Sequence, residues 1–348
     1  MTRRDVLRLV PIPFLAPAAR ADEGDDFERI DAHTHIHRDV PEVFDGLKAT
    51  KWSCLDLVVC PSVGDEPIDL ESSLRSAGTA AANSGGRLAW ASTFDARGFE
   101  APGFTERVIG RLQQSFADGA IGVKVWKNIG MAVRGKSGAY LLPDDPALLP
   151  IYEAIGRADK TLIAHLAEPD GAWLPLDASN PELPYYSKNP EWHMFGRAEV
   201  PRKEAILASR DRVLDRYPQL RVVGCHLGSD EDNLDRLARR LDAHPNFAVD
   251  TAARVRYFAR ADRDQARDFL TRYQDRVLYA TDFVLRDLDP AVGARGLQAM
   301  HAHDWRFFAG DAPMDYEGRP TRGLALPEAV LRKLFRGNAR RWLPGLGI

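Results

Sequence analysis

Two histidines close to the N-terminus form the strongest chemical signal in the sequence. His33 and His35 lie in the run IDAHTHIH at 30–37, where the preceding apolar residues predict a β-strand. Successive side chains of a strand point to opposite faces, so His33 and His35 point to the same side. Two imidazoles placed in this way can bind one metal ion, whereas the competing interpretation is a pair of polar residues that caps the strand. The spacing favours a metal site at the carboxyl end of this strand.

Three more potential ligands follow apolar runs in the same way. His165 follows TLIA, His226 follows RVVGC, and Asp282 follows VLYAT. Taken singly, either of these histidines could also be a buried core residue with satisfied hydrogen bonds. Taken together, imidazole and carboxylate groups at four strand ends suit one divalent ion, most simply Zn²⁺, with Mn²⁺ or Fe²⁺ as alternatives.

Eight short apolar runs, separated by longer amphipathic segments, must position these residues. The runs predict strands at 29–32, 55–60, 88–92, 121–125, 161–164, 220–225, 247–250 and 277–281. Apolar residues at intervals of three and four predict helices at 105–116, 147–158, 202–217, 231–243 and 263–273. Apolar strands that alternate with helices are typical of a parallel α/β fold, here a (β/α)8 TIM barrel. The carboxyl ends of barrel strands meet at one mouth, where active sites lie.

The interval at 167–201, after the fifth predicted strand, is too long for an ordinary connection. It contains Trp173, Trp192 and His193, and disordered segments are poor in aromatic residues, so we expect an ordered loop over the barrel mouth. These three side chains are candidates for contact with a substrate, and packing within the loop is the alternative. The acidic side chains of the loop, Glu168 among them, are interpreted as solvated charges.

These motifs together resemble the amidohydrolase superfamily, in particular the amidohydrolase-related group (amidohydrolase family 2) of metal-dependent TIM-barrel hydrolases and decarboxylases. The resemblance extends from Ile30 to about Leu343. It rests on D-x-H-x-H at 31–35, the histidine of the fifth strand, GCHLG around His226 and the Thr-Asp pair at 281–282. The segment LRKLFRGNARRWL is similar to the closing helix of the group. Such motifs are specific for the superfamily and only weakly specific for the reaction.

The resemblance implies a ligand set for one divalent ion: His33, His35, His165 and Asp282. An ion with an open coordination position lowers the pKa of a bound water to about 7. The resemblance also implies that Asp282 accepts the proton of this water. His226 would then lie beside the water and orient or polarise the scissile carbonyl.

Lys124, in GVKVWKN at the end of the fourth predicted strand, leaves the number of metal ions open. Members of the superfamily that bind two metals carry a carboxylated lysine on this strand, whereas others keep the lysine and bind one ion. A charge pair at the barrel mouth is a further explanation, and we favour one metal ion. At the rim, Arg254 suits a substrate carboxylate or is a surface residue. Trp126 is a candidate for the lining of an apolar pocket.

Residues 1–21 have the three parts of an export signal: a charged start with Arg3 and Arg4, an apolar stretch, and small residues at Ala19 and Ala21. The paired arginines indicate the twin-arginine machinery, which exports folded proteins. A proline-broken N-terminal arm is the alternative. We expect an exported, periplasmic protein whose residues 22–348 form a single barrel domain.

The composition excludes several other classes of protein. With 47 Lys and Arg against 50 Asp and Glu, the formal charge is −3, and the absence of a basic block argues against a nucleic-acid partner. The apolar runs are shorter than the roughly 18–20 residues that cross a bilayer, so no membrane span is expected. The 3 cysteines, an odd number in apolar surroundings, predict buried thiols rather than a disulfide framework. The sequence leaves the oligomeric state open.

Three functions remain, each with a small molecule as partner. The leading hypothesis is hydrolysis of a small lactone, amide or ester by metal-activated water. Non-oxidative decarboxylation of an unsaturated or aromatic acid with the same ligands is the alternative. The third is an exported metal- or ligand-binding protein without turnover, against which Asp282 argues because storage does not need a base at an open site.

Overall fold

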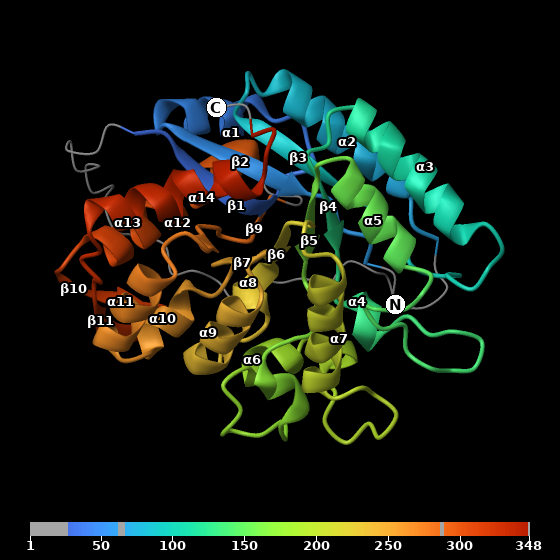
Figure 1. Ribbon diagram of the computed structural model, residues 1–348. Helices are drawn as coiled ribbons and strands as arrows, with labels where there is room; N and C mark the ends of the chain where they lie inside the picture. The colour runs from blue at the N-terminus through green and yellow to red at the C-terminus, as the bar shows by residue number, and fades with distance from the viewer. Residues whose placement is uncertain (1–26, 62–66, 286–288, 347–348) are drawn as a thin grey trace.

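Nine strands in the described part of the chain form one parallel sheet that curls around a common axis (Figure 1), and two further strands form a separate antiparallel pair. The computed structural model describes residues 27–61, 67–285 and 289–346, so the predicted export signal at 1–21 lies outside the described residues. The sheet has the order β8-β7-β6-β5-β4-β3-β2-β1-β9. Its strands are β1 Arg29–His35, β2 Trp52–Leu57, β3 Leu88–Thr93, β4 Gly122–Val125, β5 Thr161–Ala164, β6 Val222–Gly224, β7 Phe247–Asp250, β8 Val277–Leu278 and β9 Phe283–Val284.

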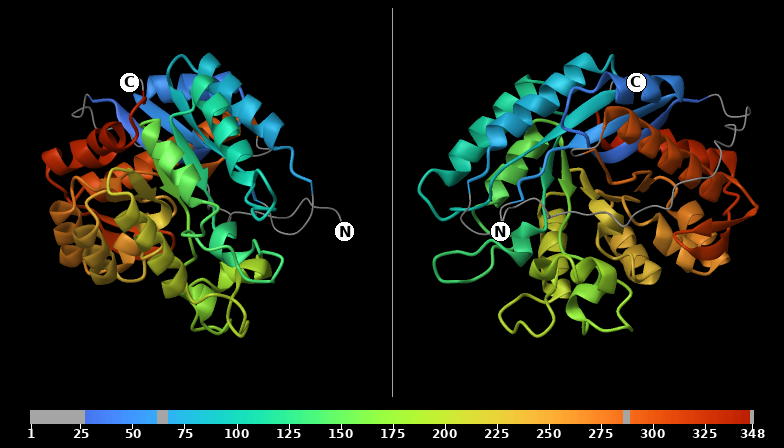
Figure 2. Two further views of the ribbon diagram at one scale, coloured as in Figure 1. Left: turned by 45° about the vertical axis from the view of Figure 1, so that its right-hand side comes forward. Right: turned by 180° about the vertical axis from the view of Figure 1, so that it is seen from behind.

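Helices connect successive strands and cover the outer face of the sheet (Figure 2). Because both faces of each parallel strand are covered, the strands are buried almost throughout, as the continuous apolar runs predicted. The longer helices are α1 Pro41–Ala49, α2 Leu70–Asn83, α3 Phe104–Ala117, α5 Leu149–Arg157, α7 Lys203–Arg216, α9 Leu234–Ala243, α11 Arg263–Arg272 and α12 Pro290–Ala309. None of the helices in the described part of the chain combines the length and apolar character that a membrane crossing requires.

The eighth strand is interrupted, which corrects the prediction of one strand at 277–281. Its first part, β8, pairs with β7, and its second part, β9, pairs with β1. Between the two parts, Tyr279 O accepts a hydrogen bond from Ala32 N (3.0 Å), and Asp282 has a φ of +67°. Thr281 donates its N–H (3.1 Å) and hydroxyl (2.6 Å) to the Asp31 carboxylate instead of to a strand partner. This split segment joins the two edges of the curled sheet and turns Asp282 towards its carboxyl end.

A register shift in β1 sets the direction of the two histidines. The pairing of β1 with β2 is irregular between Asp31 and Thr34. Ile30 and Ala32 belong to the apolar cluster that fills the inside of the sheet, and the extra residue then brings His33 to the same inner side. Asp31 faces the opposite way, towards α12. The predicted alternation therefore holds for His33 and His35, but the shift decides which face they occupy.

Other strand and helix boundaries moved by a few residues. The second strand begins at Trp52 instead of residue 55, and the sixth ends at Gly224 because the chain turns at His226. The helix predicted at 231–243 begins at Leu234, where the Asn233 side chain accepts a hydrogen bond from the N–H of Arg236.

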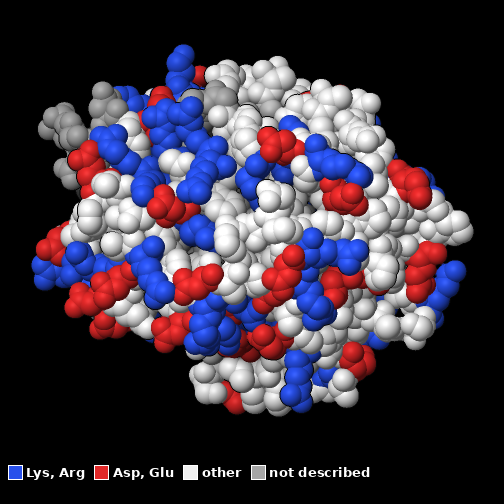
Figure 3. Space-filling view, viewed as in Figure 1, with Lys and Arg blue, Asp and Glu red and all other residues white. Residues whose placement is uncertain are grey.

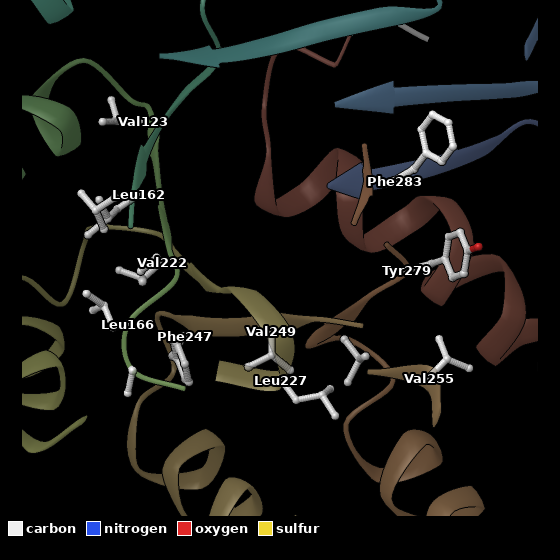
Figure 4. Close-up of a cluster of buried hydrophobic side chains, with 14 of the residues drawn as sticks. Val123, Leu162, Leu166, Val222, Leu227, Phe247, Val249, Val255, Tyr279 and Phe283 are labelled. Carbon is white, nitrogen blue, oxygen red and sulfur yellow. The ribbon is translucent and has the colours of Figure 1, made fainter. Parts of the chain in front are cut away.

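Two apolar layers alternate along the strands. Outward-facing residues such as Val123, Leu162, Val222 and Val249 follow one another from β4 to β7 and pack against the helices (Figure 4). Alternate residues of the strands, such as Ile163, Val223 and Ala248, fill the inside of the sheet, together with Trp342 from α14 Asn338–Trp342. Thr161, the first residue of β5, donates its hydroxyl to the Trp342 carbonyl (2.5 Å). The C-terminal helix therefore covers the amino ends of the strands and leaves the carboxyl ends for the site.

The predicted loop at 167–201 folds into short helical turns beyond the carboxyl ends of the strands. These are η1 Asp170–Trp173, α6 Leu183–Tyr186 and η2 Pro190–Trp192. Tyr186 and Trp192 are buried, and the Lys203 ammonium of α7 contacts Asp170 at 2.6 Å. In Figures 1 and 2 this segment projects below the sheet. The remaining elements are α4 Asn128–Met131, α8 Cys225–Gly228, α10 Val255–Arg260, a β10–β11 hairpin (Pro313–Tyr316 and Arg319–Arg322), α13 Glu328–Arg332 and a π-helical turn, η3 Lys333–Gly337.

Candidate metal centre

Three of the predicted ligands lie together at the end of β1. The Nε2 atoms of His33 and His35 are 3.3 Å apart. Oδ1 of Asp282 is 3.2 Å from Nε2 of His33 and 3.3 Å from Nε2 of His35. Ligand atoms bonded to one ion at about 2.0–2.1 Å, at tetrahedral or octahedral angles, lie roughly 2.9–3.4 Å apart. The three separations therefore fit a single ion.

Hydrogen bonds on the far side of each ring fix the orientation of these imidazoles. Nδ1 of His35 lies 2.7 Å from the Leu57 carbonyl, which only accepts, so Nδ1 carries the proton. Nδ1 of His33 lies 2.9 Å from Oδ2 of Asp250. When both Nδ1 atoms carry the proton, both Nε2 lone pairs face the Asp282 carboxylate. Three electron pairs that meet without a proton between them repel one another unless a cation lies among them, so the donor set fits a divalent ion.

The other two predicted histidines lie against each other on the β5 and β6 side. The rings of His165 and His226 meet edge to face with centroids 4.2 Å apart, and the His226 ring lies 5.1 Å from that of His33. Nε2 of His165 is buried and has no hydrogen-bond partner among the described residues. A buried polar atom without a partner is costly, and an absent ligand is one explanation. His165 therefore fits the role of a further ligand, although its nitrogen is not part of the three-atom group formed by His33, His35 and Asp282.

His226 lies on a turn of left-handed backbone. His226, Leu227, Gly228 and Ser229 have φ values of +58°, +54°, +62° and +61°. Each non-glycine residue in this region costs on the order of 1–3 kcal/mol. The turn is held by Asp250, whose Oδ1 accepts the N–H of His226 (2.7 Å), and by a buried arginine of α7 that donates to the Gly228 carbonyl (2.7 Å). Such strain, supported from outside, is typical of functional sites.

The electrostatics of the centre favour the deprotonated forms that bind metals. Burial, reinforced by the nearby Lys124 ammonium, lowers the pKa of His33 well below its usual value. Burial also lowers the pKa values of His165 and His226. Burial would raise the pKa of Asp282, but the neighbouring imidazoles outweigh it and hold this pKa below the usual range. At neutral pH the three imidazoles are neutral and the carboxylate is ionised.

Lys124 extends into the centre from β4 and is buried. Its Nζ lies 2.8 Å from Sγ of Cys225 and 3.4 Å from Nε2 of His33. The hypothesis of a charge pair at the mouth is not supported, because the contacts described for Lys124 are to a thiol and an imidazole. Cys225, like Cys54 and Cys60, is buried and forms no disulfide within the described residues, as predicted from the sequence.

At the rim, the structure removes one of the two alternatives for Arg254 and corrects the interpretation of Glu168. Arg254 is 7% exposed and forms an ion pair with Glu231, so it is not a surface residue. Glu168 is 4% exposed and pairs with Lys127, so its interpretation as a solvated loop charge is wrong. Tyr185, Tyr186 and Trp192 of the loop contact the Lys127–Glu168 pair. Arg254 instead lies over the ring of Tyr257 in α10. Oε1 of Glu168 lies 3.9 Å from Nε2 of His165, which places this pair beside the metal centre.

The predicted aromatic residues divide into two groups. Trp126 and Trp192 meet edge to face with centroids 5.0 Å apart, and the Lys127 ammonium lies 4.3 Å from the centre of the Trp192 ring. In contrast, Trp173 donates to the Pro201 carbonyl (3.2 Å) and His193 contacts the Leu174 carbonyl (2.9 Å). The first pair therefore borders the Lys127–Glu168 ion pair, whereas the contacts described for Trp173 and His193 are within the loop.

Sequence reasoning missed Asp250 and the role of Glu168. Asp250 binds His33 through one oxygen and the backbone of His226 through the other, so it connects the two sides of the centre. The available signal was its position as the last residue of an apolar strand, the same signal that identified the histidines. Glu168 had no comparable signal, because it lies in the irregular loop.

Comparisons with known proteins agree with this architecture. A family profile described as Amidohydrolase matches residues 75–345, so β1 with His33 and His35 precedes the matched segment. No curated protein matched the chain.

Solved structures similar to this chain share its fold at low sequence identity. One is an uncharacterised TIM-barrel protein from Bordetella bronchiseptica, with 13% identity, a TM-score of 0.52, and coverage of 92% of this chain and 100% of that one. The second is 2,6-dihydroxybenzoate decarboxylase from Rhizobium, with 15% identity, a TM-score of 0.53, and coverage of 91% of this chain and 98% of that one. The third is a dihydroxybenzoic acid decarboxylase from Polaromonas sp. JS666 with bound manganese and an inhibitor. It has 14% identity and a TM-score of 0.51, and the match covers 91% of this chain and 97% of that one.

Proposed function

The chain belongs to the amidohydrolase family, and from this premise we propose that it is a metal-dependent hydrolase of a small lactone, amide or ester. The observation that carries the proposal is the group formed by His33, His35 and Asp282, in which three lone-pair-bearing atoms lie 3.2–3.3 Å apart. The side chain of Asp282 is 28% exposed, so one ligand of the group is in reach of water.

We assign one divalent ion to His33, His35, His165 and Asp282, with Zn²⁺ as the first choice and Mn²⁺ or Fe²⁺ as alternatives. The bound manganese of the Polaromonas decarboxylase supports a divalent ion in this fold. When bound, the ion polarises a carbonyl and lowers the pKa of water to about 7. We propose that Lys124 stays a buried lysine and that the centre binds one ion.

We assign Asp282 to proton transfer and His226 to the orientation of water. Asp282 is ionised at neutral pH, and its exposed edge can accept a proton from water. Nδ1 of His226 lies 2.8 Å from the Ala252 carbonyl and therefore carries the proton of the neutral ring. Nε2 of His226 then accepts a hydrogen bond and cannot donate one to a carbonyl. His226 is thus better suited to orienting water than to polarising the substrate.

The segment 167–201 supplies the part of the proposed site that excludes water. Trp126 and Trp192 lie beside the Lys127–Glu168 pair and provide an apolar surface for the substrate. Arg254 keeps its proposed role towards a substrate carboxylate, with Glu231 holding its guanidinium in place. We propose that Trp173 and His193 act within the loop as packing residues.

Decarboxylation of an unsaturated or aromatic acid is the second candidate. The two tryptophans, which meet edge to face, favour a flat substrate, and two of the similar structures are decarboxylases of dihydroxybenzoic acids. Acidic and basic side chains are interspersed over the face seen in Figure 3, so neither sign of charge dominates this face as positive charge dominates a surface that binds a nucleic acid. A small molecule remains the proposed partner.

A substrate screen on protein of defined metal content tests the proposal. Protein stripped of metal and reloaded with Zn²⁺, Mn²⁺ or Fe²⁺ is assayed against lactones, esters, amides and aromatic acids. We expect acid release from a lactone, ester or amide, loss of it in Asp282→Asn, and its retention in Asp177→Asn, which alters a carboxylate exposed in the loop. Release of CO₂ would establish the decarboxylase instead. Binding without any turnover would support a binding protein.

Export is proposed separately. We propose that residues 1–21 direct the folded protein through the twin-arginine machinery to the periplasm. Replacement of Arg3 and Arg4 by lysine should keep the protein in the cytoplasm on cell fractionation, and unchanged export would contradict the proposal.

A further inference from the structure

A buried histidine of α12 lies behind the candidate metal centre. His301 is 2% exposed, and its ring stacks on Trp52 with centroids 3.8 Å apart and an interplanar angle of 11°. Nε2 of His301 lies 3.0 Å from Oδ2 of Asp31. Its other ring nitrogen, Nδ1, is buried without a hydrogen-bond partner among the described residues. The hydrogen bond to Asp31 is therefore the one polar contact described for this ring.

Asp31 connects the two chain segments that carry the three assembled ligands. Its Oδ1 accepts the N–H of His33 (3.2 Å) and the N–H of Thr281 (3.1 Å). Its Oδ2 accepts the hydroxyl of Thr281 (2.6 Å) as well as the His301 hydrogen bond. Asp31 is fully buried, so protein donors replace the water that an exposed carboxylate would bind.

The hydrogen bonds between Asp31 and Thr281 also fix the backbone of Asp282. Thr281 directly precedes Asp282, which has the left-handed φ of +67° and donates its N–H to the His33 carbonyl (2.9 Å). A non-glycine residue keeps such a backbone only where its surroundings enforce it. The two hydrogen bonds from Thr281 to Asp31 enforce it here.

We propose that His301 is a positioning residue for the metal centre, acting through Asp31 and Thr281; these three residues form the His301 relay. The stack on Trp52 fixes the plane of the imidazole, and its Nε2–H then holds the Asp31 carboxylate in one orientation. Asp31 in turn fixes His33 and Asp282 relative to each other before any ion binds. The inference rests on the proposed metal site but is independent of the reaction.

The alternative role of His301 is packing alone, and two substitutions separate the roles. His301→Phe keeps an aromatic ring on Trp52 and removes the hydrogen bond to Asp31. His301→Gln removes the aromatic stack and keeps an N–H donor. Thr281→Val removes the hydroxyl contact of Asp31 from the other end of the relay. His303→Phe is the matched control, because His303 lies on the same helix and its ring packs on Tyr316 with centroids 4.8 Å apart.

The test is the affinity for Co²⁺ alone, measured by competition with a chelator, together with the visible absorption spectrum of the Co²⁺ protein. Loss of an outer-shell partner typically weakens metal binding about 10- to 100-fold. We expect His301→Phe to weaken Co²⁺ binding about 10-fold, in line with that range, and to change the spectrum. Thr281→Val should act in the same direction, His301→Gln should restore part of the affinity, and His303→Phe should behave as wild type.

Several results would overturn the inference. Wild-type affinity and spectrum in a folded His301→Phe protein would show that the ring only packs. If His301→Phe does not fold, unchanged Co²⁺ binding by Thr281→Val would overturn it. Weaker binding by His301→Gln than by His301→Phe would assign the effect to the stack. If the wild-type protein binds no Co²⁺, the metal centre itself fails and the inference fails with it; if it binds Co²⁺ but converts no substrate, only the proposed reaction fails.

Discussion

On the β1 side of the candidate metal centre, three potential ligand atoms lie within 3.3 Å of one another. On the β5 and β6 side, two imidazoles lie edge to face, and one buried nitrogen has no hydrogen-bond partner among the described residues. The β1 side consists of His33, His35 and Asp282, each held from behind by hydrogen bonds. The other side consists of His165 and of His226 on a left-handed turn.

The difference shows two ways in which a fold prepares a site. On the β1 side, strand geometry and hydrogen bonds place the ligands, so the arrangement exists in the protein alone. On the other side, strain and an unsatisfied nitrogen remain, and a bound ion would relieve the second of these. Asp250 joins the sides, because its two oxygens bind one residue of each.

The largest expected effect comes from removing a ligand on the β1 side. His35→Ala deletes one of the three assembled atoms and should weaken metal binding by more than the roughly 10- to 100-fold typical of an outer-shell partner. His165→Ala should weaken it less, because the three-atom group stays complete. Equilibrium titration with Co²⁺ or Zn²⁺ of both variants measures the difference. An equal loss in the two variants would show that the sides do not differ.

The next effect is expected from Asp250, which connects the sides. Asp250→Asn leaves an amide that can present either N or O to His33 and no longer fixes its tautomer. We expect about a 10- to 100-fold weaker affinity for metal. We also expect a lower kcat, because the single amide oxygen can face either His33 or the N–H of His226, but not both. Asp242→Asn, at an exposed ion pair with Arg272, is the control. Wild-type metal affinity in Asp250→Asn would contradict the claim that Asp250 connects the two sides of the site.

A smaller effect is expected from a change in the left-handed turn at His226, and it should lower stability and kcat but not metal affinity. In Gly228→Ala, the new Cβ would lie 2.9 Å from Cζ of Phe247, and the residue has a φ of +62°. We expect a stability loss of about 1–3 kcal/mol and a reduced kcat from displacement of His226, while metal affinity stays close to wild type. Gly196→Ala, with a φ of +77° but open space around it, separates the clash from the backbone cost. Lost metal binding with unchanged kcat would reverse this assignment.

The smallest expected effect on metal binding comes from Asp304, whose titration should instead make the stability of the β1 side depend on pH. Asp304 accepts hydrogen bonds from Tyr279 (2.9 Å) and Tyr316 (2.6 Å), and burial raises its pKa to about 7. The folded protein then holds a proton that the unfolded chain releases near 3.8, so the stabilisation is complete below that pH and is lost as the pH rises to 7. The slope is at most about 1.4 kcal/mol per pH unit.

Denaturant unfolding at several pH values measures this slope. Asp304→Asn, which carries no titrating group, should flatten it between pH 4 and 7 while leaving the metal affinity unchanged. The same slope in wild type and variant would show that Asp304 is ionised in the folded protein throughout this range.

Residue types at strand ends predicted which side chains lie close together at the candidate site, but not how they are held. His33, His35, His165, His226 and Asp282 each follow an apolar run, and a parallel barrel brings such positions to one mouth. The interruption of the eighth strand was not predictable, because it depends on hydrogen bonds between Asp31 and Thr281, 250 positions apart. The left-handed turn likewise depends on a carboxylate from the neighbouring strand. Local pattern specifies which residues approach the site, and long-range contacts decide their orientation.

The central claim is that one ion binds where His33, His35, His165 and Asp282 meet. Anomalous diffraction from crystals of the Mn²⁺-loaded protein tests it most directly. The account predicts one peak per chain, bonded to Nε2 of the three histidines and to Oδ1 of Asp282. A peak at the buried group of Asp31, Cys54 and His301, or no peak among these ligands at saturating Mn²⁺, would contradict it.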